Sequence, residues 1–182
     1  MRFNSSDHLS AWKQTNRFPK IHDKIYKFII EQSNGSRFLD LGACHGLLTQ
    51  RLNIEKFKWV AFGVEENNKY IEDGKLAGIT AQILNLKITT DTLNVLVDYI
   101  TKNKINTIVA RRVLPEIWGN DINGGREFAK KIYDAGIKEI FIEGRIETKN
   151  AINKLCCINN EINLLSPIYK LEHKLGFIAK LT

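Results

Sequence analysis

Residues 37–46 read Arg-Phe-Leu-Asp-Leu-Gly-Ala-Cys-His-Gly and follow a turn-forming Asn-Gly-Ser. The short apolar run over 37–41 predicts a buried strand, because turn signals bound it on both sides. Gly42 permits a tight turn with close backbone approach, and Gly46 lets the following helix pack near the strand. In a doubly wound sheet, ligands bind at the carboxyl ends of the strands where the strand order reverses. The loop over 42–46 is therefore where we first expect a binding site.

The rest of the chain alternates between short apolar strands and helices. Further strands are expected over 58–64, 79–84, 105–110 and 137–142. Helices are expected over 20–33, 46–55, 67–76, 91–102, 125–135 and 149–157, with Asp91 capping its helix. This alternation predicts an α/β fold with a doubly wound, mostly parallel sheet and helices on both faces. The last two strands, 168–172 and 177–181, flank a turn near 174–176, so we expect a C-terminal antiparallel hairpin in a seven-stranded sheet.

Composition predicts one globular domain. The chain has 182 residues, of which 43% are hydrophobic and 26% charged. We expect residues 1–35 to form a basic and aromatic segment with an amphipathic helix packed on the domain, and residues 36–182 to form the domain itself. No apolar run approaches the ~20 residues that span a bilayer, and the polar N-terminus does not resemble a secretory signal. We therefore expect a cytoplasmic protein without a membrane partner.

The cysteines and histidines do not follow the spacings of a metal site. Cys156 and Cys157 are adjacent, Cys44 is distant, and no Cys-x-x-Cys occurs. The histidines other than His45 are scattered. We expect reduced thiols and no bound metal.

The formal net charge of +7 favours acidic partners, which leaves nucleic acid open; a solvated lysine-rich surface is the alternative. The segment 12–20 mixes basic and aromatic residues, so it could cover a cofactor or hold nucleic acid by charge and stacking, or lie solvated. We expect no separate recognition domain within these residues. An enzyme of this size acting on nucleic acid would need a partner or a homodimer.

The glycine spacing distinguishes two cofactors. A dinucleotide fingerprint requires Gly-x-Gly-x-x-Gly, whereas Gly42, Cys44 and Gly46 lack the middle glycine and bring the last one a residue early. From Asp40 onward the loop resembles motif I of the class I S-adenosylmethionine (SAM)-dependent methyltransferases, (Asp/Glu)-x-Gly-x-Gly-x-Gly. The resemblance covers roughly residues 36–182. It implies SAM as the cofactor, with Asp40, Gly42, Ala43, Cys44 and Gly46 in the loop that borders its methionine moiety and ribose.

The next two strand ends extend this resemblance. Glu65 ends the second strand, 25 residues after Asp40, where a carboxylate can accept hydrogen bonds from both ribose hydroxyls. Glu66 is expected to point the opposite way. At the end of the third strand, Asn85 takes the place of the family's aspartate beside the adenine amino group, and Leu86 is expected to contact the ring.

The fourth strand end would deliver the residues that face the acceptor. Arg111 could clamp a phosphate or carboxylate, as could Arg112, and Glu116 could orient the acceptor or act as a base. An Arg–Glu ion pair within the loop is the alternative. Trp118 could stack on a planar acceptor or cover the core edge, and His45 could touch the cofactor.

Three functions stay open at this point. The first is methyl transfer from SAM to an undefined acceptor such as RNA, protein or a small molecule. The second is cleavage of SAM without an acceptor. The third is a SAM- or nucleotide-binding module that performs no reaction, which the substitution of Cys44 for a motif glycine would suit.

Overall fold

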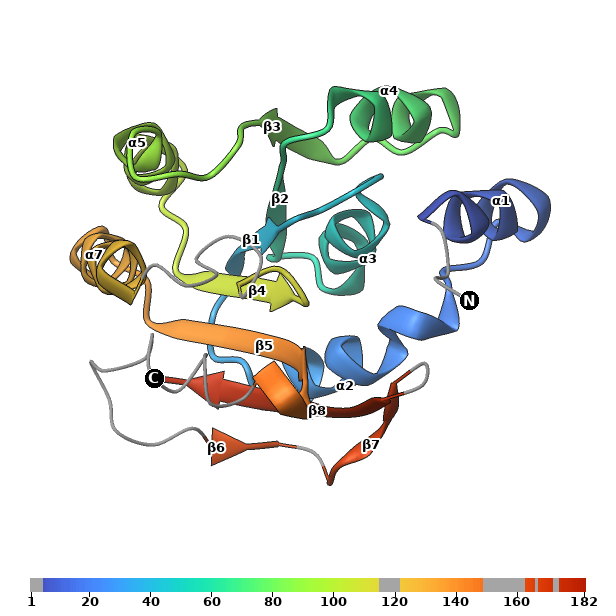
Figure 1. Ribbon diagram of the computed structural model, residues 1–182. Helices are drawn as coiled ribbons and strands as arrows, with labels where there is room; N and C mark the ends of the chain where they lie inside the picture. Colours follow the sequence, from blue (N-terminus) through green and yellow to red (C-terminus); the bar gives the residue numbers. More distant parts are fainter. Residues whose placement is uncertain (1–4, 115–121, 149–162, 166, 172–173) are drawn as a thin grey trace.

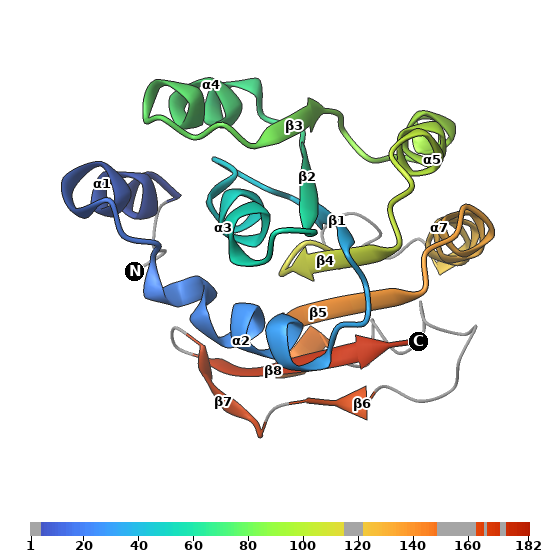
Figure 2. The ribbon, with the colours of Figure 1, turned by 180° about the vertical axis from the view of Figure 1, so that it is seen from behind.

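The computed structural model describes residues 5–114, 122–148, 163–165, 167–171 and 174–182, which form a β-sheet with helices on both faces (Figures 1 and 2). The strands are β1 (Arg37–Leu41), β2 (Val60–Glu65), β3 (Gln82–Asn85), β4 (Thr107–Arg111), β5 (Glu139–Arg145), β6 (Asn163–Leu164), β7 (Tyr169–Leu171) and β8 (Lys174–Leu181). The α-helices are α1 (Ser5–Thr15), α2 (Asp23–Gln32), α3 (Leu47–Glu55), α4 (Asn68–Leu76), α5 (Leu93–Lys102) and α7 (Ile122–Asp134). Two 3₁₀ helices are η1 (Lys20–His22) and η2 (Ile146–Thr148).

The strand order creates a switch point beside β1. The strands lie in the order β3-β2-β1-β4-β5-β8-β6, and β7 also pairs with β8. The strands from β3 to β5 run parallel, whereas β8 is antiparallel to its neighbours. The mostly parallel sheet and the antiparallel C-terminal pairing predicted from the sequence are confirmed. Because the chain goes from β1 out to β3 and then returns to β4 on the other side, the loop after β1 lies where such sheets bind ligands.

The predicted number of seven strands is corrected at the sheet edge. The described residues contain eight strands, because two short strands share the outer side of β8. β6 pairs with the end of β8, and β7 pairs with residues 174–176 at its start. Those residues thus lie in a strand and not in the predicted turn. Pro167 stands between β6 and β7, where its missing N–H cannot support a continuous ladder.

Two hydrophobic clusters cover the two faces of the sheet. On one face α5 and α7 pack against a cluster that includes Leu39 and Leu41 of β1. On the other face α2 and α3 contribute to a cluster that includes Phe38. Successive side chains of a strand point to opposite faces, so one strand serves both clusters. A sheet covered on both sides explains why its strands read as apolar runs.

The N-terminal segment packs beside α3 and α4 (Figures 1 and 2). The indole Nε1 of Trp12 donates to the backbone oxygen of Ala77 at 3.1 Å, and the rings of Trp12 and Phe18 lie 4.9 Å apart. The guanidinium of Arg51 on α3 stacks on Tyr26 and Phe18, with 3.6 and 5.6 Å to the ring centroids. The aromatic side chains of this segment therefore have partners inside the molecule.

Several element boundaries differ from those expected. The first turn of the predicted helix over 20–33 is the 3₁₀ helix η1, and α2 begins at Asp23. The N-cap of α5 is Thr92, not Asp91; its hydroxyl donates to the backbone oxygen of Lys87 at 2.6 Å, which closes the preceding loop. The predicted helix over 149–157 lies outside the described residues.

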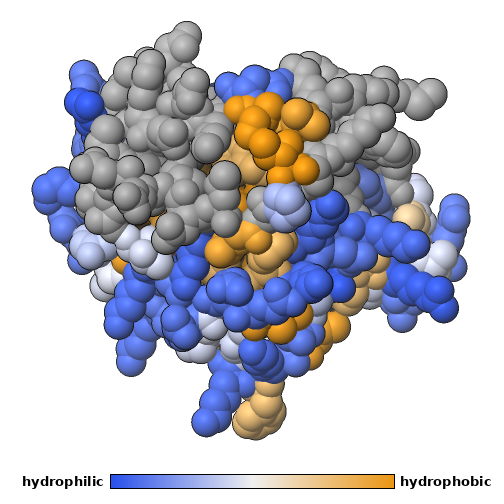
Figure 3. All heavy atoms as spheres, turned by 90° about the horizontal axis from the view of Figure 1, so that it is seen from below, coloured by the Kyte–Doolittle hydropathy of each residue, from blue (hydrophilic) through white to orange (hydrophobic). Residues whose placement is uncertain are grey.

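The surface seen from the β6–β8 edge is mainly hydrophilic, with a band of apolar side chains (Figure 3). At this edge Ile168 and Leu175 are about half exposed. Among the described helices, none is both long and apolar enough to cross a membrane.

Candidate functional site

The loop after β1 lies against the end of β2. The backbone N–H groups of Gly42 and Ala43 both donate to the oxygen of Val64, at 2.9 Å each. Gly42, Cys44 and Gly46 all have positive φ angles, of 70°, 53° and 81°. Cys44 thus adopts the left-handed conformation that a glycine at the middle position of the motif would adopt. This conformation costs a non-glycine residue about 1–2 kcal/mol.

The two glycines of the loop are also required by space. A Cβ on Gly42 would come within 2.9 Å of Val113, and one on Gly46 within 2.7 Å of Ile83 on β3. Gly46 thus allows the start of α3 to approach the sheet, as its position in the sequence predicted.

The carboxylate of Glu65 joins the ends of β1 and β2. The side chain is 8% exposed. One oxygen accepts from the backbone N–H of Cys44 and the other from that of Asn67, each at 2.9 Å. A carboxylate offers about four acceptor positions, so capacity for further donors is left. Buried and held by two N–H groups, this carboxylate is preorganised to bind hydroxyl groups.

Asp40 lies beneath the loop rather than on its outer side. It is 3% exposed and accepts a 2.9 Å hydrogen bond from the hydroxyl of Thr49 on α3. Burial raises the pKa of Asp40 to about 7, although the Thr49 bond and the charge of Arg111 act against that rise. Asp40 therefore supports the loop from below.

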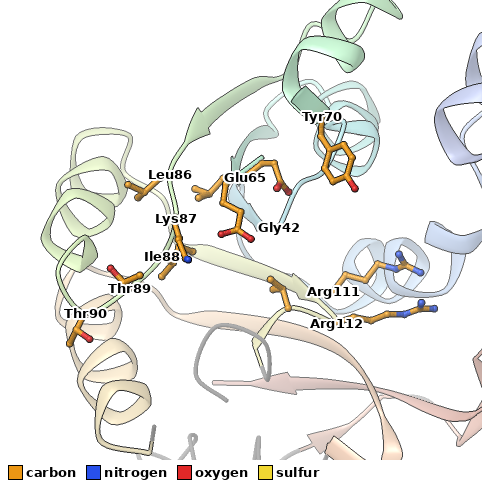
Figure 4. A pocket seen from close by; sticks show the side chains of 13 residues that line it. Gly42, Glu65, Tyr70, Leu86, Lys87, Ile88, Thr89, Thr90, Arg111 and Arg112 are labelled. Carbon is orange, nitrogen blue, oxygen red and sulfur yellow. The ribbon is translucent and has the colours of Figure 1, made fainter. Parts of the chain in front are cut away.

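A cavity of about 680 Å³ opens at the switch point (Figure 4). Its walls come from the ends of β2 and β4, the loop after β3 and the start of α4. The lining residues are Gly42, Val64, Glu65, Glu66, Tyr70, Leu86, Lys87, Ile88, Thr89, Thr90, Arg111, Arg112 and Val113. Apolar side chains share this lining with acidic, basic and hydroxyl-bearing ones, so the cavity suits a small organic molecule that carries polar groups.

The end of β3 is tied to β2 by Asn85. Its amide nitrogen donates to the backbone oxygens of Glu65 and Glu66, at 2.9 and 3.0 Å. This orientation uses the donor side of the amide and leaves its oxygen as an acceptor. The side chain of Leu86 lines the cavity. Glu66 lines it too, with an exposed side chain where that of Glu65 is buried.

Arg111 forms an ion pair with a residue that the sequence did not indicate. Its Nε lies 2.5 Å from Oε2 of Glu143, and the two side chains are 15% and 1% exposed. The residues are register partners on β4 and β5. Arg112 follows with a φ of 61°, and its N–H donates to the oxygen of Glu143 at 2.7 Å. Glu116 and Trp118 lie outside the described residues.

Two histidines have lowered pKa values, His45 in the loop and His22 in η1. His45 is 3% exposed, its ring centroid lies 5.0 Å from that of Tyr70, and burial lowers its pKa. His22 comes from η1, and its pKa is lowered well below the usual value by burial and then by the charge of Arg111. His22 was overlooked because its neighbours in space come from distant parts of the sequence.

The structure brings together part of the predicted cofactor set. Gly42, Glu65 and Leu86 line the cavity. Asp40, Ala43 and Gly46 are buried and do not line it, and Cys44 and Asn85 make hydrogen bonds to Glu65, which does. Tyr70 and the stretch 87–90 were not predicted to line the site. The position of 87–90 directly after a strand end is the signal that could have indicated them.

No protein-family model matches the chain, and no curated protein matches its sequence. Solved structures do match its fold. An uncharacterised protein of Listeria monocytogenes serotype 4b matches with a TM-score of 0.63 at 20% identity, over 90% of this chain and 67% of that one. A SAM-dependent methyltransferase of Aquifex aeolicus matches with a TM-score of 0.56 at 11% identity, over 100% of both chains. M. capricolum TrmK, in complex with S-adenosylhomocysteine (SAH), matches with a TM-score of 0.53 at 17% identity, over 87% of this chain and 65% of TrmK. The chain therefore has the fold of class I SAM-dependent methyltransferases.

Proposed function

We propose that the chain binds SAM in the cavity beside β1 and transfers its methyl group to an acceptor. The observation that carries this proposal is the placement of Glu65. Its buried carboxylate lines a cavity at the switch point, next to a loop whose backbone is held as motif I requires. The fold shared with methyltransferases of known structure adds support.

The residues around the cavity suit the parts of SAM. Glu65 would accept hydrogen bonds from the ribose hydroxyls, with Asn85 and Leu86 at the adenine. Gly42 and the backbone of Cys44 would border the methionine part, over a floor made by Asp40, Ala43 and Gly46. The loop does not suit a dinucleotide, because it lacks the glycine spacing with which a dinucleotide site binds pyrophosphate.

The chemistry demands little of the protein beyond positioning. SAM supplies an electrophilic methyl group on a sulfonium, so alignment with the acceptor accounts for much of the rate. Arg111 and Arg112 end β4 beside the cavity and are the residues we assign to the acceptor, together with Glu116. Glu143 would hold the Arg111 guanidinium in place through its 2.5 Å contact.

Calorimetry with SAM, SAH and NAD tests the cofactor. We expect SAM and SAH to bind and NAD not to bind. Binding of NAD without SAM would refute the proposal.

Two further measurements test the reaction. Incubation with SAM alone should leave the SAM pool intact, whereas its loss would indicate cleavage without an acceptor. Tritiated methyl transfer from SAM into fractionated cell extract should label one fraction and so identify the acceptor class. If no fraction is labelled while SAM binds, the chain is a binding module.

A further inference from the structure

His22 carries a buried nitrogen that finds no partner in the part of the chain that the structure describes. Its Nδ1 is inaccessible to solvent and accepts or donates no hydrogen bond there. Buried polar groups in folded proteins are nearly always hydrogen-bonded, because an unpaired one costs about 1–3 kcal/mol. A histidine that leaves its ring nitrogen unpaired inside the fold therefore points to a missing ligand.

A second unpaired donor belongs to Arg111. Glu143 engages Nε of this guanidinium, while Nη2 is buried and has no hydrogen-bond partner among the described residues. Figure 4 shows the guanidinium groups of Arg111 and Arg112 extending side by side from the end of β4, on one border of the cavity. The charges of both guanidinium groups act on His22 and lower its pKa.

The charges acting on His22 have one sign. Besides its burial, the groups that depress the His22 pKa are Arg111, His8, Arg51 and Arg112, all of them basic. Two of these charges have carboxylate partners, Arg111 in Glu143 and Arg51 in Asp23, and the groups that act on His22 still make its surroundings positive, which favours an anion there. Groups with strongly shifted pKa values and unpaired donors gather at binding sites more often than elsewhere.

We infer that His22, Arg111 and Arg112 form an anion site that holds a phosphate group of the acceptor beside the cofactor cavity. The inference rests on the proposed function, because it places this group next to the SAM site and names the class of acceptor. A phosphate group presents several terminal oxygens, which suits an imidazole donor and two guanidinium groups arriving from different elements. The group would belong to a nucleotide or to an RNA strand.

The test uses the full chain saturated with SAH, so that the cofactor site is filled. Phosphorus NMR titration of inorganic phosphate should show binding that His22→Phe and Arg112→Gln each weaken by about 10-fold, since each loses a hydrogen bond to a charged group. His22→Asn, which retains an N–H donor near the position of Nδ1, should restore part of the affinity. Lys102→Ala removes one charge from the end of α5 and should leave phosphate binding unchanged.

The source of the phosphate is tested by competition. Uridine monophosphate and a single-stranded RNA of a dozen nucleotides should each displace phosphate from the chain, and the stronger competitor identifies the acceptor as a nucleotide or an RNA. If the variants bind phosphate as the unaltered chain does, the inference is wrong.

A second comparison separates this site from the cofactor site. SAH carries a carboxylate, and 5′-methylthioadenosine carries none. The affinity for SAH should be the same in His22→Phe, Arg112→Gln and the unaltered chain. The same should hold for the affinity for 5′-methylthioadenosine. If the variants lose affinity for SAH alone, the three residues bind the cofactor carboxylate and the inference is overturned, while the proposed function stands. If the unaltered chain binds no SAH, the proposed function itself fails.

Discussion

The carboxylate of Glu65 at the end of β2 accepts a 2.9 Å hydrogen bond from the backbone N–H of Cys44 in the loop after β1. This bond joins the two strand ends that form one wall of the cavity. It also explains how a loop with cysteine at the motif's middle position retains its shape, since the N–H of Cys44 is held by a buried charge.

Replacing Glu65 should weaken binding of the cofactor product. Glu65→Gln keeps the size of the side chain and removes the charge that would hold the ribose hydroxyls. Hydrogen bonds to a charged group contribute about 1.5–3 kcal/mol, so SAH affinity should fall about 10- to 100-fold in calorimetry. Glu31→Gln, on an exposed residue of α2 that does not line the cavity, is the control and should change affinity by less than about 3-fold. Equal losses in the two variants would contradict the assigned role.

Gly42 should be sensitive for two separable reasons. Gly42→Ala places a Cβ at a φ of 70° and 2.9 Å from Val113. Gly78→Ala has a similar φ of 84° with nothing within 4 Å of the new Cβ, so it isolates the backbone strain. Gly78→Ala should lower the free energy of unfolding by about 1–2 kcal/mol through backbone strain, and Gly42→Ala should lower it further because of the contact with Val113. Only Gly42→Ala should also reduce SAH affinity, and a reduction in both would mean that strain anywhere in the fold has this effect.

Breaking the ion pair between Arg111 and Glu143 should be costly for stability. Glu143→Ala leaves a mostly buried guanidinium without its counter-charge, so urea denaturation should show a loss of about 3–5 kcal/mol. The exposed pair of Lys130 and Asp134 is the matched control, and Lys130→Ala should cost less than about 1 kcal/mol. The double variant Arg111→Met/Glu143→Leu should recover most of the loss, because both charges leave the interior together. A double variant as unstable as Glu143→Ala would refute this account.

Asp40 should make stability depend on pH in the direction opposite to most carboxylates. Its pKa in the folded chain is raised from 3.8 to about 7, chiefly by burial. Between these two values the folded state binds more protons than the unfolded state, so stability falls as pH rises from about 4 to about 7 and then levels off. The contribution is on the order of a few kcal/mol.

Asp40→Asn removes this titration while keeping the side chain's shape. Urea denaturation at pH 5 and pH 8 should therefore show a smaller fall in stability for Asp40→Asn than for the unaltered chain. Asp134→Asn, on an exposed residue, should leave the fall unchanged. An identical fall in Asp40→Asn would contradict the raised pKa.

The core of the fold could be predicted because its signals are local. The apolar run ending at Leu41, the glycines that follow and the alternation of strands with helices all lie within short stretches, where backbone preference and burial act on neighbouring residues. The predicted helix and strand boundaries are wrong where no local signal exists. Thr92 rather than Asp91 stands at the N-cap of α5, and its hydroxyl donates to the backbone oxygen of Lys87 in the preceding loop instead of capping the helix. The division of the edge into β6 and β7 depends on which residues reach β8.

The sequence by itself determined the α/β class, and it predicted the loop at 42–46 and the carboxylate of Glu65 as parts of a binding site, because these residues follow strand ends at the spacing of a known motif. Only the tertiary structure decided that Asp40 is buried under the loop and that Arg111 pairs with Glu143. It alone brought His22 from the N-terminal segment toward Arg111. These relationships depend on strand register and helix packing, which join residues far apart in the chain. The spacing of residues along the sequence therefore does not predict such contacts.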